Sequence, residues 1–523
     1  MKTRALESNQ AWLSPVAFLL ALCVAWKIGG WIAEGDVSSV IYLALGAGAC
    51  AIALAILKNW RSGFYIFIAW LFLEDFIRKY MGNSMIIYFA KDALAAMLYV
   101  AFLAAVRQRR ATFYRFPFLI FLSLFFWLGI IQCFNPNSPS FLYSLLGFKL
   151  YFYYIPLLFI GYNLVQRKQD LRRFLIANIS WAGVIALLGI AQSILGPSFL
   201  NPRTLSEDIR DLSTLYRYAP ISGASFYQPN SVFVSAGRFD SYLMLAWLVG
   251  MGGVGYILLQ RCRGQFVTLA GLALVAVATL MCGGRGALVY VVASGPVLAI
   301  AFLWGAPRRL KQTHRIVKAV WRTALAAGTS LLIAAVLFPQ AIGARWSYYT
   351  ETLLPSSPAE QLTSRVNVYP LQELEKAFQQ GNWISGHGLG TASLGVQYVS
   401  QWLGKGRPGF AVESGYGNIV LELGIAGLLL WFCWTAALLI HSFKILRQLR
   451  QTAFFPLAFA IFWFAFLLLY PATYTSINGF QDYIYNAYLW LLIGILYRLP
   501  VLASEQEEAV RTNRLGTWTI SHV

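Results

Sequence analysis

The feature that most constrains this chain is a series of long, nearly continuous apolar runs, such as Phe118–Leu128 and Leu428–Cys433. An unpaired backbone amide is costly in hydrocarbon, so a membrane-spanning segment must be a helix or part of a closed barrel. Barrel strands alternate polar and apolar residues, which these runs do not. With 58% apolar and 12% charged residues over 523 positions, the chain is predicted to be an all-α, polytopic membrane protein.

Membrane spans can be placed by length, because a hydrocarbon core of ~30 Å requires about 20 apolar residues per helix. This criterion predicts about 14 spans, with a range of about 12 to 14. Their centres lie near residues 20, 47, 68, 97, 125, 152, 183, 249, 273, 295, 331, 427, 461 and 491. The first run follows the basic stub Met1–Arg4 without an evident cleavage site, so we expect a retained span.

The basic residues indicate the orientation of these spans. If the amino terminus is cytoplasmic, most of the 41 Lys and Arg residues fall in cytoplasmic loops, and both termini lie on that side. The formal charge of +20 comes from short clusters between apolar spans, not from one basic face. We therefore expect membrane lipids as partners, and no nucleic acid.

The spans and loops predict six regions. They are N-terminal transmembrane helices (1–195), a periplasmic loop (196–238), central transmembrane helices (239–340), a large periplasmic loop (341–412), C-terminal transmembrane helices (413–500) and a cytoplasmic tail (501–523). The large loop should carry short helices, since Tyr369–Gly381 has proline near its start and glycine at its end.

Three charged residues near the predicted external face are not explained by hydropathy. Arg238 precedes the eighth span, Arg285 lies between the ninth and tenth, and Glu413 opens the twelfth. Ionisable residues there are costly and are often functional. The glycines at 284 and 286 would let a ligand approach the backbone, and a guanidinium suits a phosphate or pyrophosphate. Snorkelling of the arginines and a helix-dipole role for Glu413 remain alternatives.

Other polar features of the sequence are weaker candidates for a functional site. Gly386–Gly390 is expected to be a flexible external loop in which His387 is either a substrate contact or a surface histidine. Glu74–Lys79 and Lys91-Asp92 are expected to form salt bridges at helix ends. Six scattered cysteines without a CxxC pair indicate neither disulfides nor zinc, and we expect no metal and no cofactor.

The order of several short motifs resembles the bacterial O-antigen polymerase and O-antigen ligase superfamily, including its exopolysaccharide polymerases. The similarity covers roughly residues 230–430. Its elements are Gly-Arg238, Gly-Gly-Arg285-Gly-Ala-Leu, Ser364-Arg365, Gly386-His-Gly-Leu-Gly-Thr391, and Glu413 through Glu422-Leu-Gly-Ile-Ala-Gly427.

This resemblance implies a GT-C-like membrane glycosyltransferase at the periplasmic face of the bacterial inner membrane. Its substrate would be an undecaprenyl-diphosphate-linked oligosaccharide, and its partners could include other polysaccharide assembly and export proteins. Arg238 and Arg285 would hold the diphosphate. Ligases of the superfamily usually have His-Asn where this chain has Glu413-Ser414, so Glu413 would be the proton acceptor. Further substrate contacts would come from Arg365, His387, Gly284, Gly286 and Tyr416.

The glutamate favours a polymerase over a ligase that joins glycan to lipid A-core. Two alternatives from other classes remain at this stage. The chain could be a lipid-linked oligosaccharide flippase or anion carrier, although the unusual charges lie at one face instead of the midplane. It could also be a non-catalytic scaffold for polysaccharide export.

Overall fold

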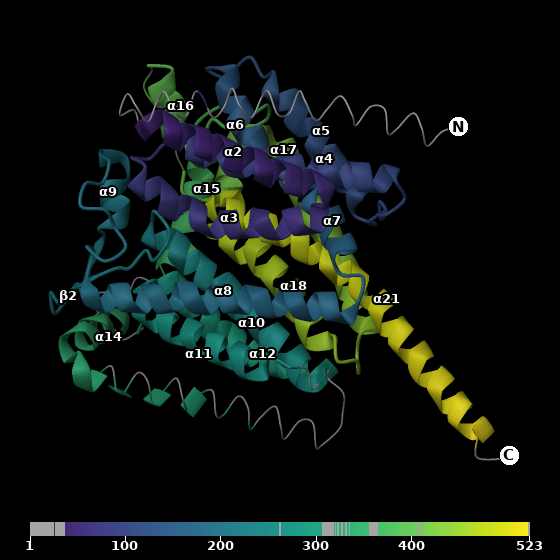
Figure 1. Ribbon diagram of the computed structural model, residues 1–523. Coiled ribbons are helices and arrows are strands. Elements are labelled where there is room, and N and C mark those ends of the chain that lie inside the picture. The colour runs from purple at the N-terminus through teal and green to yellow at the C-terminus, as the bar shows by residue number, and fades with distance from the viewer. Residues whose placement is uncertain are drawn as a thin grey trace. The chain divides into compact units, whose positions relative to one another are not determined.

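The computed structural model describes residues 37–260, 263–305, 335–354, 364–404 and 412–520, together with Trp26 and isolated positions within 318–333 and 406–409. Contacts divide the chain into two units, one made of 1–69 and 91–105, the other of 70–90 and 106–523. In the described part of the chain the regular elements are mostly helices (Figure 1), and two short strands form a two-stranded sheet.

Eight helical segments in the described residues are long and apolar enough to cross a membrane. They are Met85–Arg107 (α4), Phe141–Leu164 (α6 and α7), Lys168–Leu195 (α8), Ala236–Gln260 (α10), Arg285–Gly305 (α12), Gly415–Gln448 (α17), Phe455–Thr475 (α18, η2 and α19) and Tyr483–Glu505 within α21 (Tyr483–Ile520). Shorter apolar helices are Gly46–Lys58 within α2 (Val37–Lys58), Leu119–Cys133 (α5) and Gln265–Met281 (α11).

These helices confirm an all-α membrane protein, whereas the number of 14 spans stays a prediction. A helix, α3 (Trp60–Tyr80), occupies the position predicted near residue 68. The spans predicted near residues 20 and 331 are centred outside the described residues. The orientation of the termini also stays a prediction.

The smaller unit contains α2, the first half of α3 and much of α4. Trp60 on α3 meets Phe102 on α4 edge to face, with ring centroids 5.4 Å apart. Both rings are buried, and an aromatic pair in this geometry adds about 0.5–1.5 kcal/mol beyond its burial.

The larger unit holds the aromatic core and the candidate site. In it α10 packs against α8, α11, α12 and α18, and Figure 1 shows α8, α10, α11 and α12 running alongside one another. The helices α7 (Leu157–Leu164) and α21 cross at two glycines: a Cβ on Gly161 would meet the Leu491 carbonyl oxygen at 2.2 Å, and one on Gly494 would meet that of Leu158 at 2.1 Å. Small residues let these two backbones touch.

The predicted external segments contain more regular structure than a loop. The first has a short helix, α9 (Glu207–Ser213), and an antiparallel hairpin of β1 (Tyr216–Tyr218) and β2 (Ser225–Tyr227), which pairs Arg217 with Phe226. The second has the predicted short helices, α14 (Pro339–Leu353), α15 (Tyr369–Gln379) and α16 (Val396–Trp402). The hairpin is not predicted, because two three-residue strands leave almost no periodicity in the sequence.

Substitution of Gly161 by alanine should weaken the α7–α21 contact. The added methyl group would overlap the Leu491 carbonyl, and overpacking of this kind costs about 1–3 kcal/mol. We expect a lower thermal unfolding midpoint of the purified protein in detergent. Gly295→Ala on α12 is the matched control, because a Cβ there meets nothing within 4 Å. Equal midpoints for the two variants would contradict the close helix crossing.

Candidate functional site

A polar cavity of about 340 Å³ lies at one end of the larger unit, where α10 and α12 begin and the α18 segment ends. The hairpin and the residues before α21 complete its wall. Its lining residues are Arg217, Gln228, Asp240, Ser241, Met244, Gly283, Gly284, Arg285, Gly286, Ala287, Tyr290, Tyr348, Ala472, Thr475, Ser476, Gly479 and Tyr485. Cavities of this size accommodate small polar ligands or part of a larger one.

The glycines around Arg285 explain how the turn between α11 and α12 reaches this cavity. Gly283 has φ +77°, a conformation that favours glycine. A Cβ on Gly284 would meet the Asp240 carboxylate at 2.1 Å, so glycine alone lets the turn pack on that group. At Gly286 a Cβ would meet nothing within 4 Å, which leaves the backbone facing open space. The start of α12 is therefore accessible to a ligand.

Two arginines face the cavity from different elements. Arg285 is the first residue of α12, and its guanidinium carbon lies 5.5 Å from the centre of the Tyr348 ring. Arg217 comes from β1, and its Nε donates to Gln228 Oε1 at 2.8 Å. Because amide groups at a helix start also favour negative charge, this arrangement can hold an anion.

Asp240 on α10 is the acidic group of the cavity. Its Oδ2 accepts a hydrogen bond from Gln228 Nε2 at 3.0 Å. The Cys282 thiol lies beside this carboxylate; burial, and then the negative charge of Asp240, raise the pKa of the thiol well above its ordinary value. Cys282 is thus a neutral neighbour of the cavity.

A buried arginine fastens the turn and the hairpin together. Arg345 on α14 donates to the carbonyl oxygens of Met281 (2.7 Å) and Tyr227 (3.1 Å), and also to those of Ala341 and Ser193. Burial lowers the pKa of Arg345 to about 10, so the side chain stays cationic at neutral pH. No sequence signal distinguishes it from the other arginines of the segments predicted to be external.

Arg238 has a different environment from the one its motif predicts. It is not among the residues that line the polar cavity. Its Nη1 pairs with Asp75 Oδ2 on α3, and its Nε donates to Asp482 Oδ2 at 3.0 Å. Asp482 in turn accepts from the first amides of α21, those of Ile484 and Tyr485. Arg238 therefore links α10 to α3 and α21.

The predicted salt bridges of Glu74–Lys79 belong to the same network. Arg78 lies 3.1 Å from Asp75 and 3.6 Å from Glu74. Lys79 donates to the Asn201 side chain and to the Ser231 carbonyl. Two of these salt bridges therefore form within α3 itself, while Lys79 bonds to segments distant in sequence. The salt bridges expected of Lys91-Asp92 stay a prediction.

Glu413 is exposed and lies just before α17. Its backbone amide donates to Glu373 Oε2 on α15 at 3.0 Å. Two residues on, a Cβ at Gly415 would meet the Thr473 carbonyl at 2.0 Å and the Ser476 backbone at 2.9 Å. Since Ser476 lines the polar cavity, Glu413 lies close in sequence to residues that pack behind one of its walls. Glu413 itself is not a lining residue.

Tyr416 and Arg365 add little to the site as described. The Tyr416 hydroxyl donates to the Tyr470 carbonyl at 3.4 Å, and the side chain is buried. The side chain of Arg365 lies outside the described residues.

The expectation of a flexible loop at Gly386–Gly390 is wrong. His387 is buried at 5% exposure, and its amide donates to the Leu421 carbonyl at 2.6 Å. A Cβ on Gly390 would meet the Tyr143 carbonyl at 1.8 Å, so the loop lies directly on α6. Side-chain amides also clamp it: Gln132, Asn135 and Asn137 donate to the carbonyls of 385 and 386. The alternating glycines permit packing, not motion.

Behind that loop lies a buried carboxylate. Glu422 on α17 is 0% exposed, and its Oε1 accepts from the Ala392 amide (3.0 Å) and the Ser393 hydroxyl (2.7 Å). Gln481 completes the cluster by accepting from the Leu394 amide and donating to Ser393. Glu422, the first residue of the Glu422–Gly427 motif, therefore holds the residues that follow the glycine loop.

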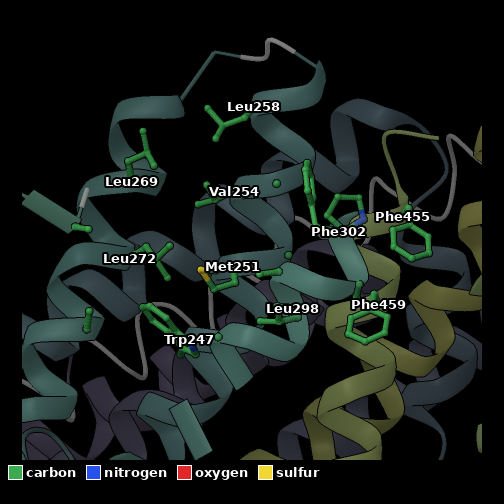
Figure 2. Close-up of a pocket in the computed structure, with 18 of the residues that line it drawn as sticks. Trp247, Met251, Val254, Leu258, Leu269, Leu272, Leu298, Phe302, Phe455 and Phe459 are labelled. Carbon is green, nitrogen blue, oxygen red and sulfur yellow. The ribbon is translucent and has the colours of Figure 1, made fainter. Parts of the chain in front are cut away.

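An apolar cavity of about 590 Å³ lies toward the opposite ends of α10, α12 and the α18 segment from the polar one. Figure 2 shows side chains of these helices and of α11 around it, among them Trp247, Leu272, Phe302 and Phe459. On α10 the two cavities are three residues apart, at Met244 and Trp247, which is about 4.5 Å along the helix.

The consecutive residues Gly284, Arg285 and Gly286 all line the polar cavity. They share it with Arg217, Gln228 and Asp240, which the sequence analysis did not identify as site residues. Asp240 follows Arg238 by two residues, and this closeness to a predicted site residue is the one sequence feature that could have indicated it. Arg238, His387 and Tyr416 lie elsewhere, in contacts with protein groups. Within the described residues, no group of three or more His, Cys, Asp and Glu side chains could hold a metal ion.

Loss of Arg238 should destabilise the larger unit. An R238M variant leaves Asp482 without its arginine, and breaking a buried ion pair costs about 3–5 kcal/mol. We expect a large drop in the thermal unfolding midpoint, partly restored in R238M/D75N/D482N, where the two carboxylates are neutral. R203A, at an exposed arginine, should leave the midpoint nearly unchanged. A wild-type midpoint for R238M would contradict the structural role.

His387 should make stability depend on pH. Burial lowers the pKa of His387 below 6.5, and hydrogen bonds with the Gly381 and Gln380 carbonyls offset part of this effect. The unfolded chain therefore binds a proton first as the pH falls, so stability is lost below about pH 6.5. We expect the midpoint to drop between about pH 7.5 and about pH 5.5, and H387Q to reduce that drop. The control H441Q should keep the wild-type pH response.

A comparison of this chain with protein-family models, curated proteins and solved structures found no match. The polar cavity and the order of the sequence motifs are therefore the basis for assigning a function.

Proposed function

We propose that this protein is a membrane glycosyltransferase that polymerises undecaprenyl-diphosphate-linked oligosaccharide units into surface polysaccharide at the periplasmic face of the bacterial inner membrane. The observation that carries the proposal is the polar cavity at Arg285. It combines two arginines with an accessible helix start, and it lies at the Gly-Gly-Arg-Gly motif of the sequence resemblance. Such a cavity suits the diphosphate of a lipid-linked glycan.

Arg285 would act on the leaving group. In a single displacement with inversion, the acceptor hydroxyl oxygen attacks the anomeric carbon, and the bond from that carbon to the diphosphate oxygen breaks. Negative charge then grows on the diphosphate. A guanidinium already in place, together with the amides at the start of α12, lowers the energy of that charged state.

Arg238 would support this chemistry from behind the cavity. To bind a diphosphate directly it would have to leave Asp75 or Asp482, both of which hold it now. We propose instead that it fixes the starts of α10 and α21, from which Asp240 and Tyr485 line the cavity.

Glu413 would accept the proton of the acceptor hydroxyl. It is an exposed carboxylate at the start of α17, next to residues that pack behind the cavity wall at Ser476. The acceptor glycan would then approach from the side of α15 and α17. Separation from Arg285 would favour the role, because a nearby cation makes a carboxylate a weaker base.

The lipid part of the substrate would bind in the apolar cavity. The apolar cavity lies along the same helices as the polar one, and hydrocarbon is the ligand that its lining favours (Figure 2). With the basic loops on the cytoplasmic side, the polar cavity would open toward the periplasm.

An O-antigen ligase would use the same site with a lipid A-core acceptor. The two activities differ in their products: polymerisation gives a ladder of glycan lengths, whereas ligation changes attachment to the lipid anchor. Gel analysis of surface polysaccharide distinguishes the two activities in a strain that lacks the gene for this protein.

The central test is an R285A variant expressed in that strain. Loss of one preorganised donor to a transition-state charge typically lowers turnover about 10²- to 10³-fold, so we expect the long glycan chains to disappear. E413Q should have a similar effect. R203A removes an exposed external arginine outside the cavity and should keep the wild-type ladder. Full-length polymer from R285A, at a wild-type protein level on immunoblots, would remove the proposal.

A further inference from the structure

We infer that Arg217 is the second diphosphate-binding arginine of the polar cavity, and that Asp240 and Gln228 are positioning residues that orient it. The identity of the anion rests on the proposed function, but the arrangement of the three side chains does not. They join the hairpin, the segment that follows it and α10 across one wall of the cavity.

The hydrogen bonds have a fixed direction. A guanidinium can only donate and an ionised carboxylate can only accept. Gln228 must therefore turn its Oε1 to Arg217 Nε (2.8 Å) and its Nε2 to Asp240 Oδ2 (3.0 Å). The amide cannot be reversed without losing both bonds. Because Gln228 is 1% exposed, water offers little substitute for either bond.

This chain of bonds leaves the terminal nitrogens of Arg217 available. Gln228 holds Arg217 through Nε, and no other hydrogen bond or ion pair is found for its guanidinium among the described residues. Arg238, by contrast, is paired with two carboxylates. A planar guanidinium held at one edge can present its outer nitrogens to two oxygens of a phosphate group.

The balance of charge in the cavity also favours an anion. Arg217 and Arg285 are positive and Asp240 is the one acidic residue of the lining, so the lining keeps at least one net positive charge. Asp240 lies against Gly284, which leaves its carboxylate between the turn and Gln228. Its role is to hold Gln228, and through it Arg217, without cancelling the attraction of both arginines.

The test measures binding of geranyl diphosphate to the purified full-length protein in detergent at constant ionic strength. R217A should weaken binding about 10- to 100-fold, the range for loss of hydrogen bonds to a charged group. R217K should bind at an intermediate level, since it keeps the charge but not the fork. R203A, which removes an exposed arginine of the same external segment, should bind like wild type. Equal effects of R217A and R203A would overturn the assignment.

Positioning is tested by double-variant cycles. Q228L and D240A should each weaken binding several-fold, whereas D240N, whose amide oxygen can still accept from Gln228, should retain most of it. Combined with R217A, neither Q228L nor D240A should weaken binding further, because both act through Arg217. Additive losses would overturn the positioning role. So would a D240N variant that binds normally but has lost glycosyl transfer, since that pattern marks Asp240 as a proton acceptor.

The binding experiment and the polymer experiment can fail separately. If R217A and R285A lose geranyl diphosphate while surface glycan is unchanged, the anion site stands and the glycosyltransferase proposal falls. If wild-type protein binds no geranyl diphosphate, the inference about Arg217 falls regardless of what polymer the cells make.

Discussion

The ion pairs of Arg238 are the interaction on which the larger unit most depends. Asp75, Arg238 and Asp482 are more than 150 positions apart in the sequence. Their charged atoms nevertheless meet at the starts of α10 and α21. Charges removed from water are tolerated only when each has a partner, so this cluster fixes how the three segments lie. The polar cavity is built on the helix starts that the cluster holds.

The sequence was informative wherever a residue type had one physical use. Long apolar runs indicated membrane helices, and helices are found there. The glycines around Arg285 indicated an accessible turn, and Gly286 does face open space. The proline and glycine at the ends of Tyr369–Gly381 located α15 to within two residues.

The sequence was less informative where one residue type has two different structural uses. Alternating glycines at 386–390 suggested a flexible loop, although glycine also permits the tight packing that is found against α6. The two carboxylate partners of Arg238 could not be predicted, because both are remote in sequence. Arg217 went unnoticed because its position depends on a hairpin with two three-residue strands. For the glycine loop and for Arg238 the deciding contacts are long-range, and one sequence does not record them.

Arg345 contributes to the electrostatic potential inside the polar cavity. Its four hydrogen-bond acceptors are neutral carbonyl oxygens, so its charge is solvated but not cancelled. Mobile ions screen charges in water within about 10 Å at ordinary salt, but they cannot enter a packed interior. Arg345 is buried behind the turn that carries Arg285, and it adds a positive potential to the cavity. Salt should weaken this potential less than it weakens the attraction of the two lining arginines for an anion. The proposed diphosphate binding should therefore retain a component that persists at high ionic strength.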